Sequence, residues 1–127
     1  MRVVVDTSVM IDYLRRRSAQ TSLYASLIGK AGMVLSLISV AELYSGKSAW
    51  RNEEQRKLVE DMLSGVEIIV PTIGIAKEAG RLRLTNQLTL PDAFIASLAL
   101  DLVVPLVTLN TSDFQRIKGL KLYPSMS

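Results

Sequence analysis

The chain has 127 residues, of which 49% are hydrophobic, and a formal net charge of +3 from 15 basic and 12 acidic residues. This length predicts a single domain over residues 1–127, and no apolar run reaches the roughly 18 residues that span a bilayer. The absence of cysteine and histidine excludes disulfides, thiolate metal sites and histidine-dependent catalysis. We therefore expect a cytoplasmic protein without a membrane segment, whose chemistry depends on carboxylates, lysines or an oxygen-bound metal.

Short apolar strands and amphipathic helices alternate along the chain. The predicted elements, in order, are a strand at 3–5, helices at 7–17 and 20–31, a strand at 33–37, a helix opening at 39–42, a helix at 53–63, a strand at 66–70, a helix at 72–87, a helix beginning at 91, a strand at 105–109, a helical turn at 111–117 and an edge strand at 120–123. This alternation predicts an α/β fold, a three-layer α/β/α sandwich around a central, mainly parallel sheet.

Four acidic residues stand where strands end or helices begin. Asp6 directly follows the first strand, Glu42 lies in the first turn after the second, and Asp113 closely follows the fourth. Helices that follow parallel strands all begin on one side of the sheet, so these three acids are expected at one rim. Asp92 opens a helix without directly following a strand, and we infer that it joins them.

Each acid, taken alone, is also explained as a helix-capping or dipole-complementing group. The clearest case is Glu42, which stands in a capping-box spacing, S-x-x-E, with Ser39. Taken together, however, crowded carboxylates repel one another unless a cation neutralises them. The pattern therefore predicts a bound Mg²⁺, or Mn²⁺ in its place, of the kind that serves phosphoryl chemistry.

The remaining charges indicate an anionic partner. With four acids placed around metal ions, the rest of the chain carries 15 − 8 = +7 charges. Arginines 15–17 either contact phosphate or complement the dipole of a helix C-terminus. Tyr13, Tyr44 and Trp50 either stack on nucleic-acid bases or belong to the core or to an interface.

Four segments resemble one known family. They are V-V-V-D-T-S-V at 3–9, L-S-L-I-S-V-A-E-L at 35–43, L-P-D-A-F-I-A at 90–96 and L-V-T-L-N-T-S-D-F at 106–114. In this order they resemble the PIN-domain family, and most of all its VapC-type toxins of type II toxin–antitoxin modules. The resemblance covers essentially the whole chain. It implies a Rossmann-like, metal-dependent endoribonuclease that cleaves RNA, forms a homodimer and is held inactive by a cognate VapB-like antitoxin.

The resemblance also assigns residues. Asp6, Glu42 and Asp92 match the three core acids of the family. Many relatives carry a fourth acid where this chain has Asn110, so we expect Asp113 to complete the set and Asn110 to assist through a water molecule.

Hydroxyl groups flank these acids. Ser8 and Thr108 match positions that commonly orient ligands or water in the family, whereas Asp12 and Asp101 match no catalytic position and are interpreted as surface or capping residues.

Two other functions remain open. One is a non-catalytic, PIN-like binding module that works through a partner protein. The other is an aspartyl phosphotransferase with Asp6 as nucleophile, which is disfavoured because such enzymes place a second acid two residues later, where this chain has Ser8.

Overall fold

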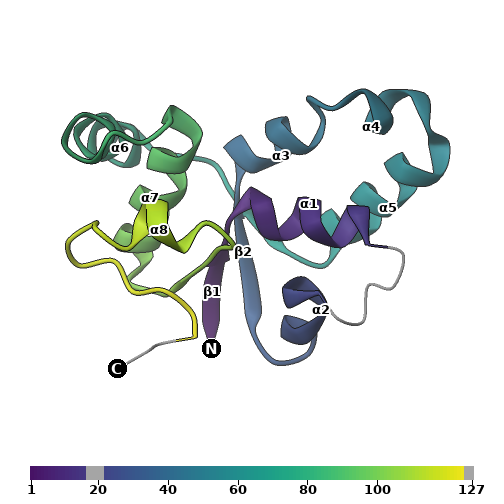
Figure 1. The fold of residues 1–127 in the computed structure, drawn as a ribbon, viewed down its shortest axis with the longest axis horizontal. Coiled ribbons are helices and arrows are strands. Elements are labelled where there is room, and N and C mark those ends of the chain that lie inside the picture. The colour runs from purple at the N-terminus through teal and green to yellow at the C-terminus, as the bar shows by residue number, and fades with distance from the viewer. Residues whose placement is uncertain (17–21, 125–127) are drawn as a thin grey trace.

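A four-stranded parallel sheet forms the centre of the protein (Figure 1). The computed structural model describes residues 1–16 and 22–124. Within them the strands are β1 (Arg2–Val5), β2 (Gly32–Ser36), β3 (Glu67–Ile69) and β4 (Leu106–Val107), in the order β3-β2-β1-β4. All three strand pairs are parallel, which confirms the predicted α/β class and its parallel sheet.

Helices cover both faces of this sheet. They are α1 (Thr7–Arg15), α2 (Leu23–Leu27), α3 (Leu37–Leu43), α4 (Lys47–Arg51), α5 (Glu53–Ser64), α6 (Ile73–Asn86), α7 (Leu90–Leu102) and α8 (Thr111–Phe114). In Figure 1, α6, α7 and α8 lie to the left of the strands, and α1 to α5 lie to the right. In the described part of the chain, no helix is long and apolar enough to cross a membrane.

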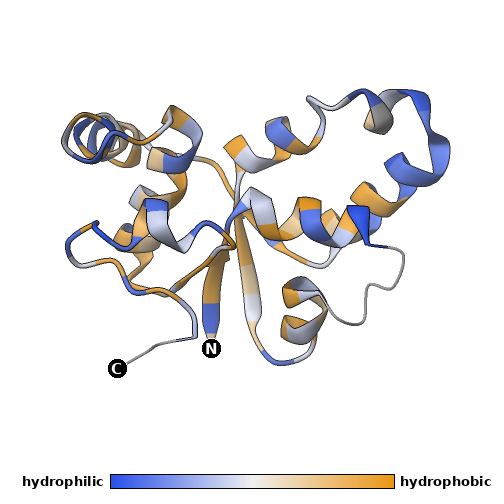
Figure 2. Cartoon of the chain, in the orientation of Figure 1, coloured by the Kyte–Doolittle hydropathy of each residue, from blue (hydrophilic) through white to orange (hydrophobic). Residues whose placement is uncertain are grey.

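The strand β1 contacts both helical layers, and its sequence explains why. Val4 belongs to the core cluster under α6 and α7, whereas Val3 and Val5 belong to the cluster under α1 and α5. All three valines are fully buried, because successive side chains of a strand point to opposite faces. Figure 2 shows the inner strands apolar along most of their length, as a parallel sheet covered on both faces requires.

Several predicted boundaries differ from the structure. The predicted helix at 20–31 is shorter, because α2 ends at Leu27 and Gly29 adopts a left-handed φ of 78° that no helix continues through. The end of the first predicted helix at Arg17 and the start of the second at Gln20 lie outside the described residues. The short helix α4 was not predicted.

The C-terminal strands are also shorter than expected. Residues 105–109 contribute only Leu106 and Val107 to β4, since the chain then turns and the Asn110 N–H donates to Thr108 Oγ1 at 2.9 Å. The predicted edge strand at 120–123 is a single parallel bridge between Leu122 and Leu106.

The predicted capping box of Ser39 and Glu42 is wrong. The helix α3 begins at Leu37, and its N-cap is Ser36, whose Oγ accepts a hydrogen bond from the Ile38 N–H at 3.3 Å. Glu42 consequently lies in the last turn of α3, where its carboxylate is not needed as a cap.

The order of the strands locates a crevice. The chain adds β2 and then β3 on one side of β1, and later returns to place β4 on the other side. In open α/β sheets, ligands bind outside the carboxyl ends of the strands at such a reversal. The residues that directly follow β1 and β4 are Asp6 and Thr108.

Candidate active site

The carboxylate of Asp6 lies at the carboxyl end of β1 and is almost completely buried, with 2% of the residue exposed. Its Oδ2 accepts hydrogen bonds from Thr108 Oγ1 at 2.7 Å and from Ser8 Oγ at 2.8 Å. Asp6 occupies the N-cap position of α1, yet its side chain makes no capping hydrogen bond. The capping explanation of Asp6 is therefore wrong, and two hydroxyls hold its carboxylate instead.

The two hydroxyls are oriented by the backbone that follows β4. The Asn110 N–H donates to Thr108 Oγ1 at 2.9 Å, and the Leu109 N–H donates to Ser8 Oγ at 3.2 Å. Because each hydroxyl oxygen accepts from an N–H, its own proton is directed to Asp6. The carboxylate is thus fixed by residues about a hundred positions apart in the chain, which the sequence pattern alone did not connect.

Glu42 is held in a similar way from α1. Thr7 Oγ1 donates to Glu42 Oε1 at 2.7 Å and lies 2.8 Å from Ser39 Oγ. Thr7 and Ser39 are both buried, whereas Glu42 is only partly so. Thr7 was not among the predicted site residues, although it stands directly after Asp6 as the middle residue of D-T-S.

Asp92 lies in the first turn of α7, whose N-cap is Thr89. The Asp92 N–H donates to Thr89 Oγ1 at 3.3 Å. Burial, then the negative charge of Asp6, and to a smaller extent the charges of Glu42 and Asp113, together raise the pKa of the Asp92 carboxyl to about 6. A hydrogen bond with Thr89 partly opposes the increase. The negative charges of the other three acids therefore act on Asp92.

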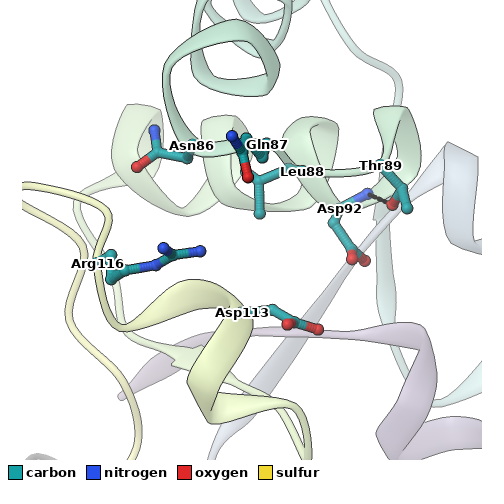
Figure 3. A pocket seen from close by; sticks show the side chains of 7 residues that line it. All are labelled: Asn86, Gln87, Leu88, Thr89, Asp92, Asp113 and Arg116. Carbon is teal, nitrogen blue, oxygen red and sulfur yellow. Dashed lines mark hydrogen bonds between the residues drawn. The ribbon is translucent and has the colours of Figure 1, made fainter.

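Asp113 completes this group from α8 and is exposed. Asp92 and Asp113 line one polar pocket of about 140 Å³, together with Arg116 (Figure 3). The two carboxylates point into the same space from α7 and α8. Among the described residues, the Asp113 carboxylate has no hydrogen-bond partner, and neither has the side chain of the exposed Asn110.

The other acids and the aromatic candidates lie elsewhere. Asp12 forms an ion pair with Arg16 at 2.9 Å, and Asp101 is exposed, in agreement with their interpretation as surface residues. Tyr13 packs against Tyr24, with ring centroids 4.8 Å apart. Trp50 is 64% exposed, so an explanation as a core residue does not apply to it.

The donor set fits a hard divalent cation. Among the described residues, no three acids are grouped closely enough to hold a metal ion together. Mg²⁺ does not require such a group, since it is usually bound through one or two carboxylates and retains several water molecules. The pKa of Asp92 is raised first by burial and then by the negative charges of Asp6, Glu42 and Asp113, and a cation among these acids would favour its charged form.

A parallel α/β sheet with acids at its reversal point defines a class of proteins that bind ligands at this edge. The model of the PIN domain matches residues 3–120, and the chain belongs to the PIN-domain family.

The chain is similar to VapC-type toxins. Ribonuclease VapC1 of Methanocaldococcus jannaschii is 29% identical over 96% of this chain and 87% of that protein. A toxin–antitoxin complex from Klebsiella pneumoniae contains a chain that is 31% identical, with a TM-score of 0.73 over 93% of this chain and 94% of that one. The structure of VapBC-1 from nontypeable Haemophilus influenzae contains a chain that is 26% identical, with a TM-score of 0.77, and the match covers 96% of each chain. The chain is thus a VapC-type toxin homologue, which confirms the resemblance noted in the sequence.

Proposed function

We propose that this chain, as a single PIN domain over residues 1–127, is a metal-dependent endoribonuclease and the toxin of a toxin–antitoxin module. The observation that carries the proposal is the arrangement of the acids at the reversal point of the sheet. Hydroxyl groups hold the carboxylates of Asp6 and Glu42, and Asp92 and Asp113 line one pocket. Similarity to ribonuclease VapC1 supports the same reaction.

Asp6, Glu42, Asp92 and Asp113 would hold Mg²⁺, or Mn²⁺ in its place. The cation supplies an activated water and stabilises negative charge on the scissile phosphodiester of RNA. Thr108 and Ser8 keep the Asp6 carboxylate in one orientation through hydrogen bonds of 2.7 and 2.8 Å.

Thr7 performs the same task for Glu42. A ligand whose orientation is already fixed loses little entropy when the cation binds, so these hydroxyls contribute through positioning. The exposed Asn110 would assist through a water molecule.

A groove beside Glu42 suits the antitoxin. It has a volume of about 590 Å³, and Ile11, Leu14 and Leu43 give it an apolar part while Glu42 and Arg15 add charge. Relatives of this chain have been crystallised as toxin–antitoxin complexes. We propose that a segment of a cognate, VapB-like antitoxin lies in this groove and approaches the acids through Glu42.

A homodimer is the second part of the proposed assembly. β3 is an edge strand, and apolar side chains remain exposed along it and into α6, at Ile68, Val70 and Ile73. A second copy of the chain would cover them.

Ile73→Glu is expected to give monomers in size-exclusion chromatography with light scattering. The control variant Val103→Glu changes an exposed side chain at the far end of α7 and is expected to leave the dimer intact. Equal elution of both variants as dimers would place the interface elsewhere.

The residue two positions after Asp6 argues against the phosphotransferase. Such enzymes place a second acid there, whereas this chain has Ser8, whose hydroxyl donates to Asp6 Oδ2 at 2.8 Å. Trapping of a phosphorylated Asp6 would reverse this conclusion.

The direct test is cleavage of a broad panel of RNAs by the purified chain with Mg²⁺ or Mn²⁺. We expect cleavage that EDTA abolishes, and sequencing of RNA 5′ ends after a short pulse of expression would then identify the target. No cleavage of any RNA with either metal, together with no Mg²⁺ binding at millimolar concentration in calorimetry, would favour the non-catalytic binding module.

A further inference from the structure

The pocket that contains Asp92 and Asp113 does not end at these acids. Its other residues include Gln87, Asn86 and Arg116, and these three also line a second pocket of about 350 Å³. Because they share these residues, the two pockets adjoin, and we refer to them together as the polar groove; the acids line only the first of them. Nothing in the four-acid site itself requires this extension.

Arg116 is the cation of the groove. It follows Asp113 by three residues in the turn after α8, and Figure 3 shows its guanidinium directed into the space between α7 and α8. The ion pairs of the described residues involve Arg2, Arg16 and Arg81, and Arg116 has no hydrogen-bond or ion-pair partner among those residues. Although it shares a pocket with Asp113, the two do not pair. Its five N–H donors are thus available to an anion.

Gln87 lines the same two pockets as Arg116. It follows the end of α6 and adopts a left-handed conformation with φ 56° and ψ 39°. Such a conformation costs a residue with a side chain about 1 kcal/mol or more relative to glycine. The amide of Gln87, which can both donate and accept, lies over the groove.

We propose that Arg116 and Gln87 form a subsite for the nucleotide next to the scissile phosphodiester. This inference rests on the proposed function, because it takes RNA as the ligand. The Arg116 guanidinium binds the neighbouring phosphate through paired N–H donors, and the Gln87 amide hydrogen-bonds the nucleoside attached to that phosphate.

The position of Arg116 relative to the four acids indicates that it binds the neighbouring phosphate and not the scissile one. The scissile phosphate is met by the cation that the four acids hold, and Arg116 lies beyond Asp113 in the continuation of the groove. Contacts to a phosphate that does not react act equally on bound substrate and transition state. Arg116 should therefore lower KM and leave kcat nearly unchanged.

The test measures the binding of a short, labelled single-stranded RNA of mixed sequence in the presence of Mg²⁺. Every protein in the comparison also carries Asp6→Asn, which prevents cleavage. Arg116→Gln is expected to weaken binding about tenfold and to reduce the slope of log affinity against log salt by about 0.7, the value for one phosphate contact on a single strand. Lys118→Gln removes the same charge two residues away, from an exposed side chain outside the groove, and is expected to leave both quantities nearly unchanged.

A replacement of single phosphates by neutral methylphosphonates sharpens the assignment. Replacement of one particular phosphate should weaken RNA binding by the protein that retains Arg116, and the same replacement should leave RNA binding by Arg116→Gln unchanged. Arg116→Lys keeps the charge but loses the paired donors, so it should retain the salt slope and lose about threefold in affinity.

Gln87→Gly separates binding from stability. Glycine accepts the left-handed conformation freely, so the melting temperature should stay the same or rise while RNA affinity falls about threefold.

Equal affinity and equal salt slope for Arg116→Gln and Lys118→Gln would overturn the subsite, even if the wild-type chain cleaves RNA. Conversely, a wild-type chain that cleaves no RNA but binds it through Arg116 would retain Arg116 as a phosphate contact, and would refute both the nuclease and the position of the subsite next to a scissile phosphodiester.

Discussion

The four acids divide into an anchored pair and an open pair. Asp6 and Glu42 each accept hydrogen bonds from threonine hydroxyls, and Asp6 is buried at the end of β1. Asp92 and Asp113 stand on the first turns of α7 and α8, and Asp113 is exposed with no partner for its carboxylate among the described residues. If a cation binds among these acids as proposed, the anchored pair would fix its position, whereas no hydrogen bond among the described residues fixes the Asp113 carboxylate. The difference indicates that rigidity is concentrated where the sheet can provide it.

The largest effect is expected from the anchored pair. Asp6→Asn should reduce RNA cleavage about a thousandfold, because the central anionic ligand of the cation is lost. The amide oxygen of asparagine still accepts from Ser8 and Thr108, so circular dichroism and the melting temperature should change little. A variant that unfolds, or that cleaves at the wild-type rate, would contradict the role of Asp6.

The open pair should tolerate substitution better. Asp113→Asn is expected to reduce cleavage about tenfold to a hundredfold, since the remaining carboxylates and water can complete the coordination. Steady-state cleavage rates at several Mg²⁺ concentrations measure this, and excess Mg²⁺ should restore part of the rate. A loss as large as that of Asp6→Asn would remove the distinction between the two pairs.

A smaller effect tests the anchoring itself. Thr108→Val retains the shape of the side chain but removes the donor to Asp6 and the acceptor of the Asn110 N–H. We expect kcat to fall about tenfold and the free energy of unfolding to fall by about 1–2 kcal/mol. Thr108→Ser restores the hydroxyl and should recover most of the activity. Failure of serine to do so would attribute the effect to packing.

The smallest effect concerns the pH dependence of stability without metal. The pKa of Asp92 in the folded protein, about 6, lies above its unfolded value of 3.8, so the folded state binds more protons between these values. Stability should therefore fall as pH rises from about 4 to above 6, by about 1 kcal/mol once solvent screening of this half-buried group is allowed for.

Thermal melting in EDTA across this pH range measures the decrease. Asp92→Asn should abolish it, and Mg²⁺ should restore stability to the wild-type protein near neutral pH. An identical pH profile for wild type and Asp92→Asn would show that other groups are responsible.

The sequence predicted the central sheet well, because its inner strands are short apolar runs that end at a polar residue. Val3, Val4 and Val5 illustrate this. Helix boundaries depend on single hydrogen bonds, and these were harder to predict. Both Ser36 and Ser39 precede helical patterns, and only the backbone path shows that Ser36 is the cap.

The site was predictable in part for similar reasons. Asp6 directly follows β1, so the parallel topology alone places it at this edge, whereas Glu42 lies in the last turn of α3, the helix that follows β2. Asp92 follows a helix, and its position depends on how α6 turns into α7 through Gln87 and Thr89. The partnership of Thr108 with Asp6 could not be inferred, because it joins residues 102 positions apart.

That long separation has a consequence for the biosynthesis of the protein. The hydrogen bonds that orient Asp6 come from the segment after β4, and Asp113 follows in α8. A chain that is still being translated and lacks residues 106–113 can form β1 and β2 but has neither the hydroxyl of Thr108 nor the fourth acid. Non-local contacts of this kind form late in folding. The proposed cation site would therefore be complete only after residues 106–113 have been synthesised.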